Sequence, residues 1–219
     1  MTTAATALSL TLGQQAAVAR LAYALETPAT VAILCGPPGV GKSLVLGRVA
    51  AARPLHGRLV HRCAWRGGVP TSLHDESRDD AVLLVDDAHE ATADALAALV
   101  ESWHRRAPSG GLVLAGEGRL LTLVARDGRI EQAVMLRATL GPFTLEESTL
   151  VVASRLSLTG TQSENEALVR TIHDLAGGIP ARVVRLAELA QTIAAGAPAG
   201  RITPDDVEAV HRRLSLQAA

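Results

Sequence analysis

Residues 36–43 have the types and the spacing of a loop that binds phosphate. They read GPPGVGKS, and the apolar run at residues 31–34 leads directly into them. The glycines let backbone N–H groups approach phosphate oxygens, Lys42 reaches the β and γ phosphates, and the Ser43 hydroxyl is placed to ligate Mg²⁺. A helix expected at residues 44–52 adds the positive end of its dipole. The pattern therefore predicts a site for a nucleoside triphosphate with Mg²⁺. Its predicted residues are Gly36, Pro37, Pro38, Gly39, Val40, Gly41, Lys42, Ser43 and Leu44.

Two carboxylates stand where the second part of such a site is expected. Asp86 and Asp87 follow the apolar run at residues 81–85, which is typical of a buried strand. At the end of a strand beside the phosphate loop, Asp86 would hold Mg²⁺ together with Ser43, and Asp87 would orient the attacking water. Because aspartate is one methylene shorter than the glutamate usual there, slow hydrolysis is expected. Glu90 could replace Asp87 only if the following turn bends back.

Strand and helix patterns alternate over the first two thirds of the chain. The expected strands are 31–34, 59–63, 81–85 and 112–115, and the expected helices are 14–26, 44–52 and 92–106. Such alternation produces right-handed crossovers and a parallel sheet sandwiched by helices. The predicted fold class of residues 1–141 is therefore α/β, of the P-loop NTPase type.

From Pro142 onward, the pattern changes to helices alone. Helix starts are read at Thr144, Ser163 and Thr203, each followed by acidic residues in the first turn, and a further helix follows Pro180. Gly177-Gly178 ends the second of these helices. Residues 142–219 are therefore predicted to form a small all-α lid domain of four short helices.

Composition narrows the class of protein further. Hydrophobic residues make up 48% of the 219 but aromatic residues only 2%, so the core must be built from Ala, Leu and Val. A net charge of -1 gives no general attraction to nucleic acid or to anionic membranes. Two cysteines are too few for a disulfide framework, and the seven histidines lack the spacing of zinc ligands. With no signal-peptide pattern and no long apolar run, a cytoplasmic protein without direct membrane insertion is expected.

Five segments carry a resemblance to a known family. They are GPPGVGKS, LLVDDAHE, LVLAGEGRL, LGPFTLEES and GGIPARVV. Together they resemble the AAA+ ATPases of the ExeA/GspA type, which are related to transposition ATPases such as MuB and TniB. The resemblance covers nearly the whole chain, from QAAVARLAYALE to the helix that begins TPDDV. It implies a sheet domain and a helical lid that hold ATP and Mg²⁺, often between the subunits of a homo-oligomer.

The chain departs from that family at two carboxylates. Asp87 replaces a glutamate, and Glu117, which follows the strand expected at 112–115, replaces a neutral amide that senses the γ-phosphate. An additional carboxylate would repel the γ-phosphate unless it is paired, protonated or turned away. Asp87 and Glu117 are kept as candidate catalytic residues. For each, an acidic turn at the end of a strand is the alternative.

The arginines expected from the resemblance are also displaced. A basic residue is expected at Ala133, and the nearby substitutes are Arg126, Arg129 and Arg137. Arg129 is taken as the candidate finger that reaches a neighbour's γ-phosphate. In the lid, Arg182 is the candidate sensor, but it stands one position late, which rotates its side chain by about 100° around the helix. A solvated surface arginine is the alternative in each case.

The connection between the two motifs is short and basic. Lys42 and Asp86 are only 44 positions apart, which suggests that a strand and a helix of the family are missing. The segment 53–66 carries four arginines, two histidines and Trp65. Such a cluster fits a DNA backbone or an acidic protein face, and an ordinary solvated surface is the alternative.

Three functions remain open at this point. The first is a Mg²⁺-dependent ATPase whose oligomerisation remodels or recruits a partner protein. The second is a transposition-type regulator that binds DNA with ATP, through segment 53–66. The third is a nucleotide-held switch with little hydrolysis, which the replacements at Asp87 and Glu117 would permit.

Overall fold

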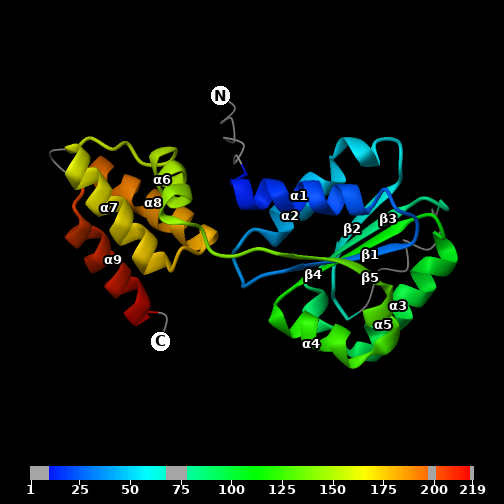
Figure 1. Ribbon diagram of the computed structural model, residues 1–219. Coiled ribbons are helices and arrows are strands. Elements are labelled where there is room, and N and C mark those ends of the chain that lie inside the picture. Colours follow the sequence, from blue (N-terminus) through cyan, green and yellow to red (C-terminus); the bar gives the residue numbers. More distant parts are fainter. Residues whose placement is uncertain (1–9, 68–77, 197–200, 218–219) are drawn as a thin grey trace. The chain divides into compact units, whose positions relative to one another are not determined.

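The computed structural model describes residues 10–67, 78–196 and 201–217. The chain divides into two compact units, Met1–Leu140 and Gly141–Ala219, which are called the sheet unit and the helical unit below (Figure 1). The functional division into a nucleotide-binding domain and a lid stays a prediction.

A parallel sheet of five strands forms the centre of the sheet unit. The strands are β1 (Thr30–Cys35), β2 (Val60–Ala64), β3 (Val82–Asp86), β4 (Gly111–Gly116) and β5 (Val134–Thr139). Their order is β2-β3-β4-β1-β5, so β4 lies between the strand that enters the phosphate loop and the strand that ends in Asp86. Because all neighbours are parallel, the carboxyl ends of these three strands meet at one edge of the sheet.

Helices cover both faces of this sheet. One face carries α1 (Leu12–Ala24) and α2 (Lys42–Ala50), and the other carries α3 (Ala93–Arg106), α4 (Gly118–Arg126) and α5 (Gly128–Ala133) (Figure 1). Every residue of β1, β3 and β4 is buried, as a strand covered on both faces requires. The predicted α/β fold, with a parallel sheet sandwiched by helices, is confirmed.

One part of the sheet unit differs from the sequence analysis. No element was expected between residues 118 and 141, where α4, α5 and β5 lie. Strand β5 is at the edge of the sheet and exposes alternate side chains, so it lacks the continuous apolar run that reveals β1 and β3. Strand β2 is the strand expected at residues 59–63, so the suggestion that a further strand is missing before Asp86 stays a prediction. Residues 68–77, on which the question of a missing helix falls, lie outside the described residues.

Arg58 closes the opposite, amino edge of the sheet. Its guanidinium donates to the backbone oxygens of Leu25 at 2.6 Å, Asp80 at 2.7 Å and Ser109 at 3.3 Å. Three connecting segments are thereby tied together by one side chain. The indole Nε1 of Trp103 donates to the Gly111 oxygen at 3.0 Å at the same edge. These hydrogen bonds stabilise the amino edge of the sheet.

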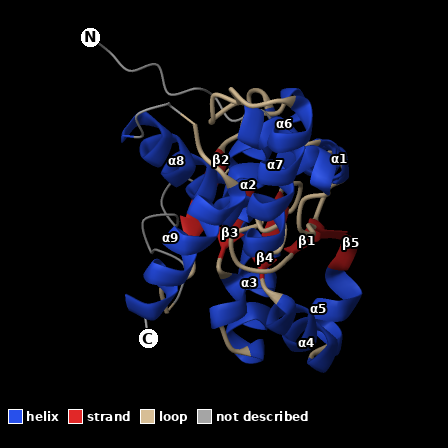
Figure 2. Ribbon diagram, turned by 90° about the vertical axis from the view of Figure 1, so that its left-hand side faces the viewer, coloured by secondary structure: helices blue, strands red, loops and turns tan. Residues whose placement is uncertain are grey.

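The regular elements of the described part of the helical unit are all helices (Figure 2). They are α6 (Leu145–Ala153), α7 (Gln162–Ala176), α8 (Pro180–Gly196) and α9 (Pro204–Gln217). Their core contains Val152, Leu168, Ile172, Val183 and Ala187. Within residues 10–67, 78–196 and 201–217, no helix combines the length and the apolar character needed to cross a bilayer.

The start of α7 corrects one prediction. Thr161, and not Ser163, caps this helix: the Thr161 N–H donates to Glu164 Oε2 at 2.7 Å, and the Thr161 hydroxyl accepts from the Glu164 N–H. Both Ser163 and Thr161 fit the general capping pattern, and the register of the helix decided between them. The predicted end is confirmed, because Gly177 follows α7 in the left-handed conformation (φ 59°).

Candidate nucleotide-binding site

The phosphate loop joins β1 to α2, and its glycines are required by the geometry. Gly39 and Gly41 have positive φ values of 81° and 98°, which L side chains rarely adopt. A Cβ atom on Gly36 would lie 2.6 Å from the backbone oxygen of Leu140, which follows β5. The loop therefore has the backbone that its sequence pattern predicts.

Helix α2 begins at this loop with an open N-terminus. Gly41 occupies the N-cap position and provides no side chain to accept a backbone N–H, and the first turn contains no acidic residue. Backbone N–H groups at the start of a helix need acceptors, and together with the helix dipole they favour an anion. The head of α2 therefore presents backbone N–H groups without a side-chain acceptor from its N-cap residue.

Lys42 and Ser43 occupy the first turn of α2. Lys42 is 8% exposed, and its Nζ donates to the backbone oxygens of Gly36 at 2.8 Å and Pro37 at 3.1 Å. The ammonium group is thereby held over the loop, with its positive charge at the place where phosphates would lie. Ser43 is exposed to solvent on the same turn. The phosphate-binding role of Lys42 and the Mg²⁺-binding role of Ser43 stay predictions.

The thiol of Cys35 lies at the base of the loop. Burial raises its pKa, and the positive charge of Lys42 opposes this shift only in part. Burial likewise raises the pKa of the Cys63 thiol on β2. Both cysteines are free, and their raised pKa values favour the protonated form.

Asp86 ends β3 at the same edge of the sheet. It is 7% exposed, its Oδ1 accepts the Asp87 N–H at 3.1 Å, and its Oδ2 lies 3.9 Å from Nη2 of Arg62 on β2. A carboxylate and a serine hydroxyl are the hard oxygen ligands that Mg²⁺ accepts, with water and substrate phosphates completing the shell. No group of three or more His, Cys, Asp or Glu side chains able to hold a metal occurs among the described residues. The donor set therefore fits Mg²⁺ delivered with a nucleotide.

Asp87 has an unusual backbone conformation. Its φ of 54° and ψ of 27° place it in the left-handed region, at the start of the short 3₁₀ helix η3 (Ala88–Glu90). Aspartate and asparagine tolerate this region better than other residues with a side chain. The chain turns sharply here, so the carboxylates of Asp86 and Asp87 belong to differently oriented backbone segments.

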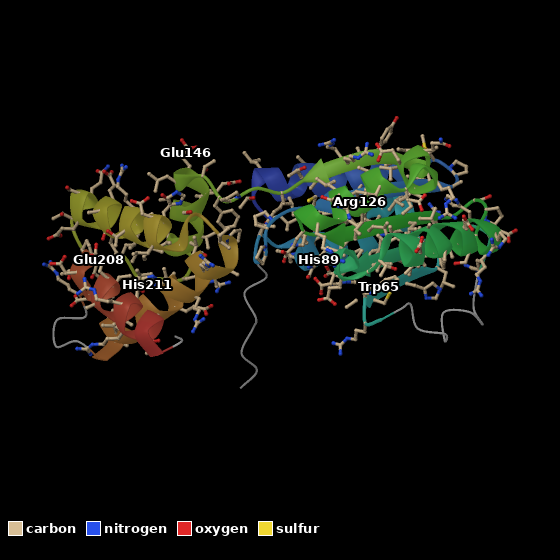
Figure 3. All side chains as sticks on the ribbon, turned by 90° about the horizontal axis from the view of Figure 1, so that it is seen from below. Trp65, His89, Arg126, Glu146, Glu208 and His211 are labelled. Atoms are coloured by element: carbon tan, nitrogen blue, oxygen red, sulfur yellow. The ribbon has the colours of Figure 1, made fainter. Side chains whose placement is uncertain are left out.

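Glu117 directly follows β4 and lies close to His89 of η3. His89 Nε2 lies 3.7 Å from Glu117 Oε1, and the Arg119 side chain donates to the His89 backbone oxygen at 2.5 Å. The His89 side chain is 17% exposed and the Glu117 side chain is 40% exposed. The neighbour of this additional carboxylate is thus a histidine, whereas Mg²⁺ or an arginine was the partner expected for it, and the role of Glu117 stays a prediction. Figure 3 labels His89, at the end of the sheet unit where β3 and β4 terminate.

The candidate arginines are not brought to the phosphate loop within the sheet unit. Arg129 begins α5, where it pairs with Asp127 at 2.7 Å and Glu101 at 3.1 Å. Its hydrogen bond to Asp127 raises the pKa of Arg129 and lowers the pKa of Asp127. Arg137 pairs with Glu131 at 2.7 Å, and Arg126 is exposed at the end of α4. In the helical unit, Arg182 is exposed in the first turn of α8.

Sequence analysis missed Gln14, which braces the phosphate loop from α1. This glutamine is 5% exposed; its Nε2 donates to the Val40 oxygen at 3.1 Å, and its Oε1 accepts the Thr11 N–H at 3.3 Å. A Cβ on Gly41 would lie 2.7 Å from the same Nε2. The available signal was a polar residue at a buried helical position, three residues before Ala17 and seven before Leu21.

The basic segment 53–66 does not form one charged face. Arg58 is used at the amino edge of the sheet, Arg62 approaches Asp86, and Trp65 is 7% exposed and packs in the core. Arg53 and Arg66 are exposed. Trp65 is therefore not available for stacking on a base.

Strand order, an open helix start after a glycine loop and an aspartate at the end of β3 are features of the P-loop fold, and the chain has the fold of the AAA+ ATPases. The RuvB Holliday junction branch migration motor of Thermotoga maritima is similar to it, with a TM-score of 0.67 and 20% identity over 92% of this chain and 69% of that one. The Aeropyrum pernix ORC1 protein in complex with DNA is similar with a TM-score of 0.62 and 18% identity, over 92% of this chain and 65% of that one. The ORC2 protein of the same organism, in ADPNP–ADP complexes, is similar with a TM-score of 0.58 and 15% identity, over 89% of this chain and 64% of that one. No protein-family model and no curated protein matches the chain.

Proposed function

We propose that this protein is a Mg²⁺-dependent AAA+ ATPase whose nucleotide-driven oligomerisation remodels or recruits a partner protein, as the resemblance to the ExeA/GspA type implies. The observation that carries the proposal is the open start of α2 beside Asp86. Lys42 is poised over a loop that the chain itself leaves without an anion, and a buried carboxylate ends a strand at the same edge. ATP supplies the phosphates, and Ser43 and Asp86 hold Mg²⁺.

Three further candidate residues complete the proposed site, one at the end of β3, one from a neighbouring subunit and one from the lid. Asp87 orients the attacking water in the interpretation drawn from the sequence. Arg129 acts from a neighbouring subunit, which requires that it leave Asp127 and Glu101 on assembly. Arg182 senses the γ-phosphate from the lid. The protein works in the cytoplasm with a partner that the chain does not identify.

Steady-state ATP hydrolysis over a range of protein concentrations tests this proposal. We expect specific activity that rises with concentration, as an oligomeric ATPase requires, and that disappears in Lys42→Ala. Arg53→Ala is the matched control, since it removes one exposed positive charge outside the loop. Tight ATP binding without turnover would overturn the hydrolytic proposal and leave a nucleotide-held switch. Absence of both would overturn nucleotide function altogether.

A DNA-dependent function is the second candidate. It is favoured by the similarity of fold to a Holliday junction branch migration motor and to an ORC1 protein solved with DNA. The exposed Arg53 and Arg66 would then contact phosphates. Anisotropy of labelled duplex DNA, with and without ATP and over a series of salt concentrations, tests this idea. ATP-dependent binding that weakens with salt and with Arg53→Ala/Arg66→Ala, but not with Arg126→Ala, supports it. No binding at low salt excludes it.

A further inference from the structure

The carboxyl edge of the sheet offers two carboxylates that could activate water, and they differ in reach. Asp87 has the shorter side chain and sits at a left-handed turn. Glu117 has one more methylene and extended backbone angles (φ -93°, ψ -179°), and its side chain is 40% exposed. A base for hydrolysis must reach the water that attacks the γ-phosphate. Both residues are half-buried, so the additional methylene is what favours Glu117.

The register of the sheet brings Glu117 next to the phosphate loop. Gly116 pairs with Cys35, and the Gly36 N–H donates to the Gly116 oxygen at 3.1 Å. Glu117 therefore follows β4 at the level where the loop leaves β1. Its negative charge also contributes to raising the pKa of the Cys35 thiol at the base of the loop. On the other side, β3 places Asp86 beside the end of β4.

His89 is held against Glu117 by close packing. A Cβ on Gly116 would lie 3.0 Å from both Cβ and the backbone nitrogen of His89, so only glycine lets η3 approach β4 this closely. The Arg119 side chain fixes the His89 backbone oxygen from the first turn of α4. The His89 Nδ1 is buried without a hydrogen-bond partner. Within the described residues, the contact of His89 Nε2 with Glu117 is therefore the only polar contact that this ring makes with another side chain.

We propose that Glu117, and not Asp87, is the base of the ATPase reaction and that His89 is its positioning residue. This inference rests on the proposed function. The water oxygen forms a bond to the γ-phosphorus as the bridging P–O bond to ADP breaks, and ADP leaves with the electron pair. The water proton passes to the Glu117 carboxylate, which later releases it to solvent. Asp87 serves to turn the chain after β3.

Single-turnover hydrolysis by the full-length protein in excess over ATP tests the assignment, with the ATP dissociation constant measured on the same samples. We expect Glu117→Gln to slow hydrolysis at least about 100-fold, the lower range for loss of a general base. Asp87→Asn should slow it less than about tenfold, since asparagine accepts the same left-handed backbone. Glu26→Gln, which changes an exposed carboxylate just after α1, is the matched control. ATP affinity should stay within about threefold in all three variants.

His89 is tested by separating kcat from KM. His89→Ala should lower kcat while leaving KM for ATP unchanged, and His89→Gln, which restores a donor near the position of Nε2, should recover most of kcat. A purely structural role would lower the unfolding midpoint of both variants and would not give this recovery. Glu117→Gln with near-normal hydrolysis, or Asp87→Asn with the larger loss, overturns the inference but leaves the ATPase proposal intact. Failure of the unmodified protein to hydrolyse bound ATP overturns both.

Discussion

Helix α2 of the sheet unit and three helices of the helical unit begin in opposite ways. Helices α6, α7 and α9 each start with a threonine whose N–H donates to an acidic side chain three residues later, at 3.0 Å, 2.7 Å and 2.9 Å. Helix α2 starts with a glycine and has no acid in its first turn. A helix start closed by its own chain serves stability, whereas one left open serves an external anion. An open start is not unique to α2, because α4 also lacks a capping side chain and an acid in its first turn. The role proposed for α2 therefore depends on the glycine loop and Lys42 as well.

The largest effect on this comparison is expected from Lys42→Ala. Removing the ammonium group should weaken ATP binding about 100-fold, because a charge-assisted bond to phosphate contributes about 1.5–3 kcal/mol. Calorimetric titration with ATP and Mg²⁺ measures this change. Arg53→Ala should bind ATP as the unmodified protein does. Unchanged affinity in Lys42→Ala would mean that the open start of α2 is not the phosphate site.

Gln14→Leu should have the next largest effect. Leucine keeps the volume but loses the bond to the Val40 oxygen, so the loop loses its brace from α1. We expect ATP binding to weaken about tenfold, which corresponds to about 1.4 kcal/mol. Gln15→Leu is the matched control, because Gln15 is exposed and donates to Leu10 instead. Equal affinities in the two variants would show that the loop holds its conformation without α1.

Thr161→Ala should lower the stability of α7 and leave the affinity for ATP unchanged. Loss of a threonine cap costs about 1 kcal/mol, and Ser163→Ala should stay within about 0.5 kcal/mol of the unmodified protein. Amide hydrogen exchange in peptides covering α7 measures both variants. If Ser163→Ala is the more damaging variant, the register of α7 described above is incorrect.

A smaller effect is expected from acid, confined to the closed helix starts. The pKa of Glu164 is lowered by the backbone N–H of Thr161, and that of Asp206 is lowered chiefly by the Thr203 hydroxyl. Because folding lowers these pKa values, the stability they contribute is complete above the unfolded values of about 4.3 and 3.9 and is lost as the pH falls through the folded ones. The helical unit should therefore weaken below about pH 4.

The two tryptophans make this pH effect measurable in the full chain. Trp65 and Trp103 both lie in the sheet unit, so fluorescence reports that unit and far-ultraviolet circular dichroism reports both. In acid, ellipticity should be lost at lower urea concentration than fluorescence. Glu164→Gln should reduce the difference between about pH 7 and about pH 3, and Glu166→Gln should not. Coincident transitions at both pH values would contradict the prediction.

Much of the fold was readable because its signals are local. Strands β1, β3 and β4 are covered on both faces, so each is a continuous apolar run, and the glycine pattern at residues 36–43 marks the loop from β1 to α2. Strand β5 was missed because an edge strand buries only alternate side chains. The start of α7 was misplaced by two residues, since Thr161 and Ser163 offer similar capping chemistry.

The sequence by itself determined the phosphate loop, the buried strand that ends in Asp86 and the change to helices after Pro142. These depend on spacing within a few residues. The tertiary structure alone decided that Gln14 braces the loop, that Arg58 closes the far edge of the sheet, and that Glu117 meets His89. The physical reason is distance along the chain: these contacts join residues 22 to 51 positions apart, and only strand order and register bring them together.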